Sequence, residues 1–266
     1  MSPRTSAGTA ADAPVAGPDA AALARVLNGL CLREGVTVFL ALALVTVVAG
    51  VMGADLAIAR ACHGADGWCG KDWPLGETLY RAGRGWAQPA LWMAVAGLLI
   101  AAVSVKARAL RPHLKAALFF PLLLALGPGL LVNVALKDHW GRPRPCQLAE
   151  FGGTHEFREA WQPGDRGPDK TPSFPSGHAS MAFATMAPWF VLRSRRRLAA
   201  SLWLAGGLAF GALVGAARIT QGGHFASDIL WSGGAVYLTG LALARAMRLD
   251  AGRASEKEVR YVPATA

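Results

Sequence analysis

Charged residues are scarce in this sequence. Aspartate, glutamate, lysine and arginine make up 17% of its 266 residues, whereas 53% are hydrophobic and the mean hydropathy is +0.32. In soluble domains of this length the apolar fraction is nearer about 45–50%. The composition therefore excludes an ordinary soluble domain.

A secretory signal is also missing. Residues 1–17, MSPRTSAGTAADAPVAG, have neither the short apolar core nor the small-residue cleavage site of such a signal. They are small, polar and proline-containing, so we expect them to be disordered. The first apolar block then predicts a retained helix whose N-terminus lies in the cytoplasm. The sequence has no internal repeat.

Only four cysteines are present, and their spacing does not indicate a zinc site. Cys31 is expected on the cytoplasmic side and the other three on the opposite side. If that side is oxidising, Cys62 and Cys69 in CHGADGWC can form a disulfide and leave Cys146 unpaired. Three unrelated thiols are an equally good interpretation, because spacing alone does not fix a disulfide.

Long apolar blocks are what the sequence does contain. A helix needs roughly 20 apolar residues to cross the hydrocarbon core. Six blocks approach that length, and the fourth is the shortest: 36–58, 87–105, 116–136, 177–192, 198–217 and 228–246. We therefore predict an all-α, polytopic membrane protein with six transmembrane helices.

The formal net charge of +10 is explained by topology. Lysine and arginine gather in the stretches KARALRPHLK (106–115) and RSRRR (193–197) and in the C-terminal tail, which share one side if the six helices alternate. Positive charge in short loops marks the cytoplasmic face. We predict a cytoplasmic N-terminal segment (1–34), a membrane domain (35–246), a basic cytoplasmic tail (247–266) and no nucleic-acid partner.

Polar residues from four helix ends are predicted to meet at the external face. Lys137 closes the third block and Arg218 closes the fifth. Ser176 and His178 begin the fourth, and Asp228 begins the sixth. Charge at membrane depth costs about 2.5–3.5 kcal/mol on insertion scales, so these groups emerge at the interface.

The residues that converge there suit a phosphate group. Lys137, Arg144 and Arg218 come from separate segments and can close on a tetrahedral dianion. Ser176 and Gly177 begin a helix, whose free N–H groups and dipole favour an anion. The alternative is that the cations are interfacial anchors whose side chains reach for the headgroups.

Two histidines can supply the chemistry. His224 and Asp228 are four residues apart, so on a helix they share one face. A carboxylate bonded to one imidazole nitrogen leaves the other nitrogen as a nucleophile. His178 can donate a proton to a leaving group. The alternative for each is structural: Asp228 offsets the helix dipole, and both histidines lie at helix starts.

Together these residues resemble the three motifs of the type 2 phosphatidic acid phosphatase (PAP2) superfamily, which also includes vanadium haloperoxidases. KDHWGRPRP (137–145) matches K-x6-RP, PSGH (175–178) matches the second motif, and ARITQGGHFASD (217–228) matches SR-x5-H-x3-D. The resemblance covers about residues 85–246. One position departs from it: Ala217 replaces the usual serine and removes a hydrogen bond to phosphate, which implies reduced or retuned activity.

The resemblance implies a metal-independent phosphatase with no cofactor. His224 attacks phosphorus and forms a phosphohistidine, Asp228 orients its imidazole, and His178 protonates the leaving group. The phosphoryl oxygens are bound by the remaining motif residues: Lys137, Arg144, Ser176, Gly177 and Arg218.

The resemblance also implies a substrate and a location. The string NVALKDHWGRPRP followed by FGG is similar to bacterial lipid A phosphatases, slightly favoured over members acting on undecaprenyl pyrophosphate or phosphatidylglycerol phosphate. The expected location is the bacterial inner membrane, with the site facing the periplasm and both termini in the cytoplasm. A lipid phosphotransferase, a non-catalytic lipid-binding or transport protein, and a vanadate-dependent peroxidase remain alternatives.

Overall fold

The computed structural model of the protein describes residues 20–71, 73–74, 76–78, 81, 107–164 and 172–249. The predicted second transmembrane block (87–105), the first 19 residues and the tail from residue 250 onward lie outside the described residues. The rest is mostly helical, apart from one two-stranded hairpin of β1 (His63–Gly64) and β2 (Gly67–Trp68).

The first apolar block forms two helices. α1 (Ala20–Val51) starts before the block and includes residues 20–34, which were predicted to belong to the N-terminal segment. Helix α2 (Ala54–Ala61) follows after a turn. The predicted continuous helix to residue 58 is wrong, because Gly53 adopts φ 63°, a left-handed conformation that ends α1. The turn places α2 at one end of the bundle.

The third block belongs to one long helical segment. It runs through α5 (Ala107–Leu124), the π-helix η1 (Ala125–Lys137) and α6 (Asp138–Trp140). Pro128 lies inside η1 and has no N–H to donate. The amide of Asn133 donates to the Pro128 carbonyl over 2.6 Å. Gly141, with φ 66°, ends α6 and redirects the chain.

The fourth block is interrupted. It contains α7 (Gly177–Phe183), the 3-10 turn η4 (Ala184–Met186) and α8 (Ala187–Leu192). The fifth and sixth blocks are uninterrupted helices, α9 (Arg197–Thr220) and α10 (Ala226–Ala246). Their bounds lie within three residues of those predicted, since a long apolar run specifies a transmembrane helix strongly.

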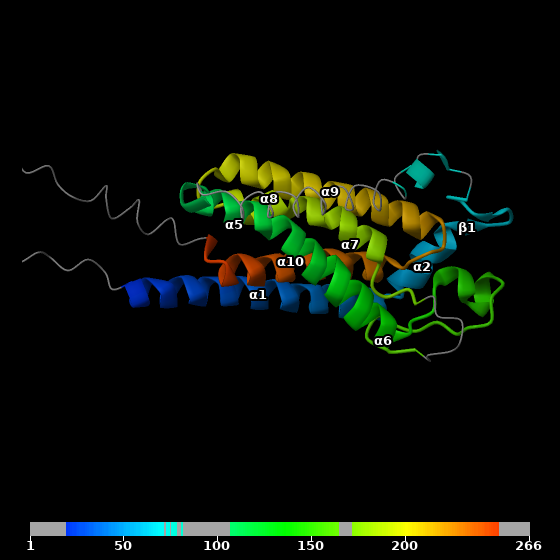
Figure 1. Ribbon diagram of the computed structural model, residues 1–266. Helices are drawn as coiled ribbons and strands as arrows, with labels where there is room; N and C mark the ends of the chain where they lie inside the picture. The colour runs from blue at the N-terminus through cyan, green and yellow to red at the C-terminus, as the bar shows by residue number, and fades with distance from the viewer. Residues whose placement is uncertain are drawn as a thin grey trace, which may run out of the picture.

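The described helices form an elongated bundle in which α10 lies beside α1, and α9 packs on α7 and α8 (Figure 1). Its core is a cluster of buried apolar side chains from α5, α7, η4, α8 and α10, among them Phe119, Leu123, Phe183, Met186 and Phe190. At one end, Glu34 accepts hydrogen bonds from Arg193 at 3.0 Å and from the Tyr237 hydroxyl at 2.6 Å. These contacts tie α1, the end of α8 and α10 together.

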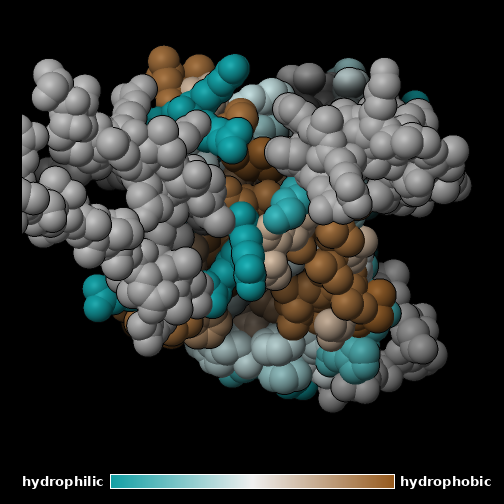
Figure 2. Space-filling model, turned by 60° about the vertical axis from the view of Figure 1, so that its left-hand side comes forward, coloured by the Kyte–Doolittle hydropathy of each residue, from teal (hydrophilic) through white to brown (hydrophobic). Residues whose placement is uncertain are grey.

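Four described segments are long and apolar enough to cross a membrane: Cys31–Val51, Lys115–Gln147, Arg197–Thr220 and Ala226–Ala246. Large apolar side chains on them are exposed, including Leu44, Val51 and Leu198, and brown apolar surface is visible in Figure 2. The chain is therefore an all-α, multi-pass membrane protein. The predicted count of six spans is not confirmed, because the second block is not described and the fourth is divided.

Candidate active site

The functional residues predicted from sequence come from helix ends that lie at one end of the bundle. Segments η1 and α9 end there, α7 and α10 begin there, and α2 and the β1–β2 hairpin lie beside them (Figure 1). The arginine-rich turn after α8 lies at the opposite end. Polar residues from segments far apart in the sequence therefore lie at the same end of the bundle.

His224 and Asp228 form the centre of this region. His224 is 1% exposed and Asp228 is fully buried. The Nδ1 atom of His224 lies 3.7 Å from Asp228 Oδ2 and 3.5 Å from the hydroxyl oxygen of Ser173. The first distance is longer than a direct hydrogen bond, although the two groups still interact electrostatically. Nδ1 is therefore the ring nitrogen that faces the carboxylate. Nε2 is the ring nitrogen on the side away from Asp228.

Asp228 is held from several directions. The backbone N–H of Phe225 donates to Oδ2 over 2.8 Å, which is the reciprocal contact expected of an acidic residue in the first turn of α10. The Ser173 hydroxyl also donates to Oδ2. Arg142 Nη1 donates to Oδ1 over 2.6 Å. The orientation of this carboxylate is therefore fixed independently of His224.

Burial lowers the pKa of His224 to about 4, because the charged imidazolium would lose its hydration in the interior. Asp228 opposes this shift, and the positive charges of Lys137 and Arg218 add to it. The imidazole is consequently neutral at pH 7, which is the form required of a nucleophile.

Two of the predicted cations, Lys137 and Arg218, lie close enough to this imidazole for their charges to act on it. Lys137 ends η1, and the charges of Arg144 and Arg218 act on it, as does that of Asp228. The guanidinium of Arg218 donates to Gln221 Oε1 over 2.5 Å and lies against Gly223, next to His224. The structure thus brings Lys137 and Arg218 toward His224, and it brings Arg144 toward Lys137.

The start of α7 reaches the same region through hydrogen bonds. The Ser176 N–H donates to the Ser232 hydroxyl over 2.8 Å, and that hydroxyl donates to the Asp228 carbonyl over 2.6 Å. The Ser176 hydroxyl is buried and accepts from the Ala179 N–H at 3.4 Å, so it caps α7. That capping role was not predicted from sequence.

The next two residues of the PSGH motif lie in the first turn of α7. Gly177 is buried, and a Cβ atom at this position would be 2.5 Å from Asn133 Oδ1, so a larger residue would displace the Asn133 side chain. His178 follows it and is half-buried.

Sequence reasoning missed three buried polar residues that lie around Asp228. Arg142 and Ser173 are fully buried, and Asp55 is 6% exposed. Arg142 follows the chain reversal at Gly141 and lies inside the first motif, where only Arg144 was predicted to bind phosphate. One sequence signal was available for Asp55: it is an acidic residue in an otherwise apolar block, and such residues are rare and functional.

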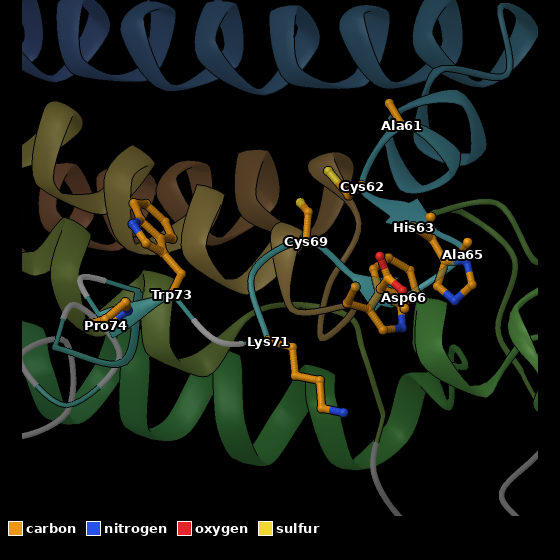
Figure 3. A pocket seen from close by; sticks show the side chains of 12 residues that line it. Ala61, Cys62, His63, Ala65, Asp66, Cys69, Lys71, Trp73 and Pro74 are labelled. Carbon is orange, nitrogen blue, oxygen red and sulfur yellow. The ribbon is translucent and has the colours of Figure 1, made fainter.

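The β1–β2 hairpin packs on the end of α9, which carries Arg218, and on the following loop, which carries His224. The Gly70 N–H donates to the Thr220 carbonyl over 2.9 Å, and the ring of Trp68 lies against Gly222. A pocket of about 580 Å³ opens at the hairpin, lined in part by Trp68, Lys71 and Trp73 (Figure 3). Within the described residues, no cluster of three or more His, Cys, Asp or Glu side chains is placed to hold a metal ion.

The family model of the PAP2 superfamily matches residues 117–250. The chain belongs to the PAP2 superfamily. This match includes every site residue predicted from sequence, whereas Asp55 lies outside it. The PAP2 assignment agrees with the order of the three motifs along the chain.

Curated relatives are similar to part of the chain. A lipid A 4'-phosphatase from Francisella tularensis subsp. novicida (strain U112) is 40% identical over 125 residues, which are 47% of this chain and 55% of the relative. A lipid A 4'-phosphatase from Rhizobium leguminosarum is 39% identical over 107 residues, 40% of this chain and 44% of the relative. The chain spans about half the length of these curated relatives.

A solved structure shares the PAP2 fold. The transmembrane PAP2 type phosphatidylglycerolphosphate phosphatase from Bacillus subtilis aligns with a TM-score of 0.50 and 18% identity, covering 87% of this chain and 98% of that one. At this identity the likeness concerns the fold, and it agrees with the multi-pass membrane architecture.

Proposed function

We propose that this protein is a membrane-bound lipid phosphatase that works through a phosphohistidine at His224. The observation that carries the proposal is the burial of a neutral imidazole beside Asp228, with the charges of Lys137 and Arg218 close enough to act on it. Cations around one nucleophile suit phosphoryl transfer, which depends mainly on positioning and charge stabilisation.

The reaction proceeds in two steps. His224 Nε2 attacks phosphorus while the bond to the leaving oxygen breaks, and His178 gives that oxygen a proton. Asp228 stabilises the imidazolium through Nδ1. The developing phosphoryl charge is bound by Lys137, Arg144 and Arg218, together with the start of α7 at Ser176 and Gly177. Water then attacks phosphorus while the Nε2–P bond breaks, and His178 takes a proton from that water, which releases inorganic phosphate and restores the neutral imidazole of His224.

A lipid of the lipid A class is the proposed substrate. Two curated relatives bear the name lipid A 4'-phosphatase. The residues matched by the PAP2 family model, 117–250, include those proposed to bind phosphate. A site at the end of a membrane bundle leaves the acyl chains of such a lipid in the bilayer while its phosphate reaches the cations.

The site is proposed to face the periplasm, across the bacterial inner membrane from the cytoplasmic termini. The turn between α8 and α9, which is rich in arginine, lies at the opposite end of the bundle from the loop between α9 and α10 (Figure 1). Arginine-rich short loops remain on the cytoplasmic side during insertion, so this arrangement supports an external site.

The test is phosphate release by the purified protein in detergent from lipid A, undecaprenyl pyrophosphate and phosphatidylglycerol phosphate. We expect His224→Ala to abolish release, while His155→Ala, which alters an exposed histidine on an external loop, should retain it. Equal release by wild type and His224→Ala would eliminate the mechanism. Transfer of phosphate to an added acceptor lipid, rather than to water, would identify a phosphotransferase instead.

A further inference from the structure

The carboxylate beside His224 is bound directly to an arginine. Arg142 Nη1 lies 2.6 Å from Asp228 Oδ1, and both side chains are fully buried. A cation at this distance cancels most of the negative charge that Asp228 would otherwise present to the imidazole, because few water molecules screen it there. The pair alone would therefore be a weak counter-ion for an imidazolium.

A second buried carboxylate lies on the other side of the same guanidinium. Arg142 Nη2 lies 2.8 Å from Asp55 Oδ2, and Asp55 is 6% exposed. Asp55 Oδ1 accepts the N–H of Ser227 over 2.9 Å, and its Oδ2 also accepts the Ser227 hydroxyl. These bonds attach α2 to the first turn of α10, immediately before Asp228.

Arg142 is held in place by further contacts. Its Nε donates to the Arg158 carbonyl over 2.8 Å, its Nη1 also donates to the Ser227 hydroxyl over 2.8 Å, and its guanidinium lies 4.2 Å from the ring centroid of Phe225. A planar guanidinium with this many directed bonds has a fixed position. The two carboxylates therefore share one immobile cation.

We propose that Asp55 is a positioning residue for the reaction at His224, acting by offsetting the charge of Arg142. This inference rests on the proposed function. The Asp55–Arg142–Asp228 cluster then carries one net negative charge, whereas Arg142 and Asp228 alone would carry none. Asp55 does not touch the phosphate, and it acts only through the charge and orientation of Asp228.

The net negative charge of the Asp55–Arg142–Asp228 cluster affects the step in which the phosphohistidine forms. When the Nε2–P bond forms and the P–O bond breaks, the proton of His178 goes to the leaving oxygen and the proton on Nδ1 of His224 stays. The imidazole then carries a positive charge that was absent before the reaction. A net negative cluster stabilises this state more than the starting state, so Asp55 accelerates phosphoenzyme formation without strengthening substrate binding.

The test compares kinetics of purified variants in detergent. For Asp55→Asn, which keeps the shape but removes the charge, we expect kcat to fall roughly tenfold or more while KM changes less than about twofold. The matched control is Glu150→Gln. Glu150 accepts a hydrogen bond from Arg60 of α2, at 2.5 Å, but this pair is exposed. The control also loosens α2, so its kcat should stay near that of the wild type.

A double variant separates charge from structure. Asp55→Asn combined with Arg142→Gln restores one net negative charge through Asp228, so its kcat should exceed that of Asp55→Asn. A purely structural role predicts the reverse, because the double variant loses more hydrogen bonds. If Asp55→Asn does not fold, the double variant alone tests the inference. A folded double variant with the KM of the wild type and a kcat within about tenfold of the wild type supports the inference. A larger loss of kcat overturns it.

The two proposals fail differently. Absence of phosphate release by the wild-type protein would refute the proposed function. Release by the wild type together with an unchanged kcat in Asp55→Asn would overturn only the role of Asp55.

Discussion

Two adjacent glycines of α9 provide a sharp test of how the bundle packs. A Cβ atom at Gly207 would lie 2.5 Å from the backbone nitrogen of Met186 and 2.7 Å from its Cβ, whereas a Cβ at Gly206 meets nothing within 4 Å. Backbone atoms cannot rotate away as a side-chain end can. Gly207→Ala must therefore move α9 away from η4, and Gly206→Ala needs no adjustment.

The two substitutions should differ in their effect on the stability of the protein. Overpacking of this kind costs about 1–3 kcal/mol, and alanine recovers up to about 1 kcal/mol of helix propensity at either position. Gly207→Ala should therefore lower the melting temperature of the purified protein in detergent by several degrees, on the order of 2–8 °C, while Gly206→Ala should leave it unchanged or raise it slightly. Thermal unfolding followed by size-exclusion chromatography measures both. Equal melting temperatures for the two variants would refute the packing described between α9 and η4.

Four other predictions concern the site. Because burial lowers the pKa of His224 to about 4, kcat/KM should fall as the pH drops through about 4 and should show no loss from this group between pH 5 and pH 7. A loss of kcat/KM as the pH falls through about 6.5 would contradict the buried imidazole. Phosphate release should persist in excess chelator and be inhibited by vanadate, which mimics a trigonal phosphoryl group; strict dependence on an added divalent metal would contradict the phosphohistidine mechanism. The thiols of Cys62 and Cys69 face each other across the hairpin, where the Cys69 N–H donates to the Cys62 carbonyl over 2.9 Å (Figure 3), so a mild oxidant should join them and protect both from alkylation. Labelling of both cysteines after oxidation would exclude the bond. Trp73→Ala, in the pocket at the β1–β2 hairpin, should raise KM for a lipid with a large headgroup but leave KM for a small phosphate ester unchanged. Equal effects on both would exclude the pocket from headgroup binding.

Much of the membrane architecture could be predicted because long apolar runs have few structural alternatives. The bounds of α9 and α10 followed directly from such runs. The fourth block was predicted less well, because α7 and α8 are separated by the 3-10 turn η4, and apolar content does not report a local change of helix type. The break at Gly53 was missed since a single glycine within an apolar block is compatible with a continuous helix.

The motif residues were predicted because their spacing places them at helix ends on one side of the membrane. The structure brings Lys137, Arg218, His224 and Asp228 together, while their catalytic roles stay predictions. Asp55 could not be linked to the site from sequence. Its partner Arg142 is 87 positions away, and that contact depends on how α2 packs beside α10.

The position of Asp55 has a practical consequence for protein engineering. A truncated protein limited to residues 117–250 would preserve all three motifs but leave the Arg142 guanidinium facing solvent or lipid where α2 had been. Transfer of residues 117–250 to another membrane protein therefore requires that α2 be transferred as well. A chimera that omits α2 would keep His224 and Asp228 but lose the ion pair between Asp55 and Arg142.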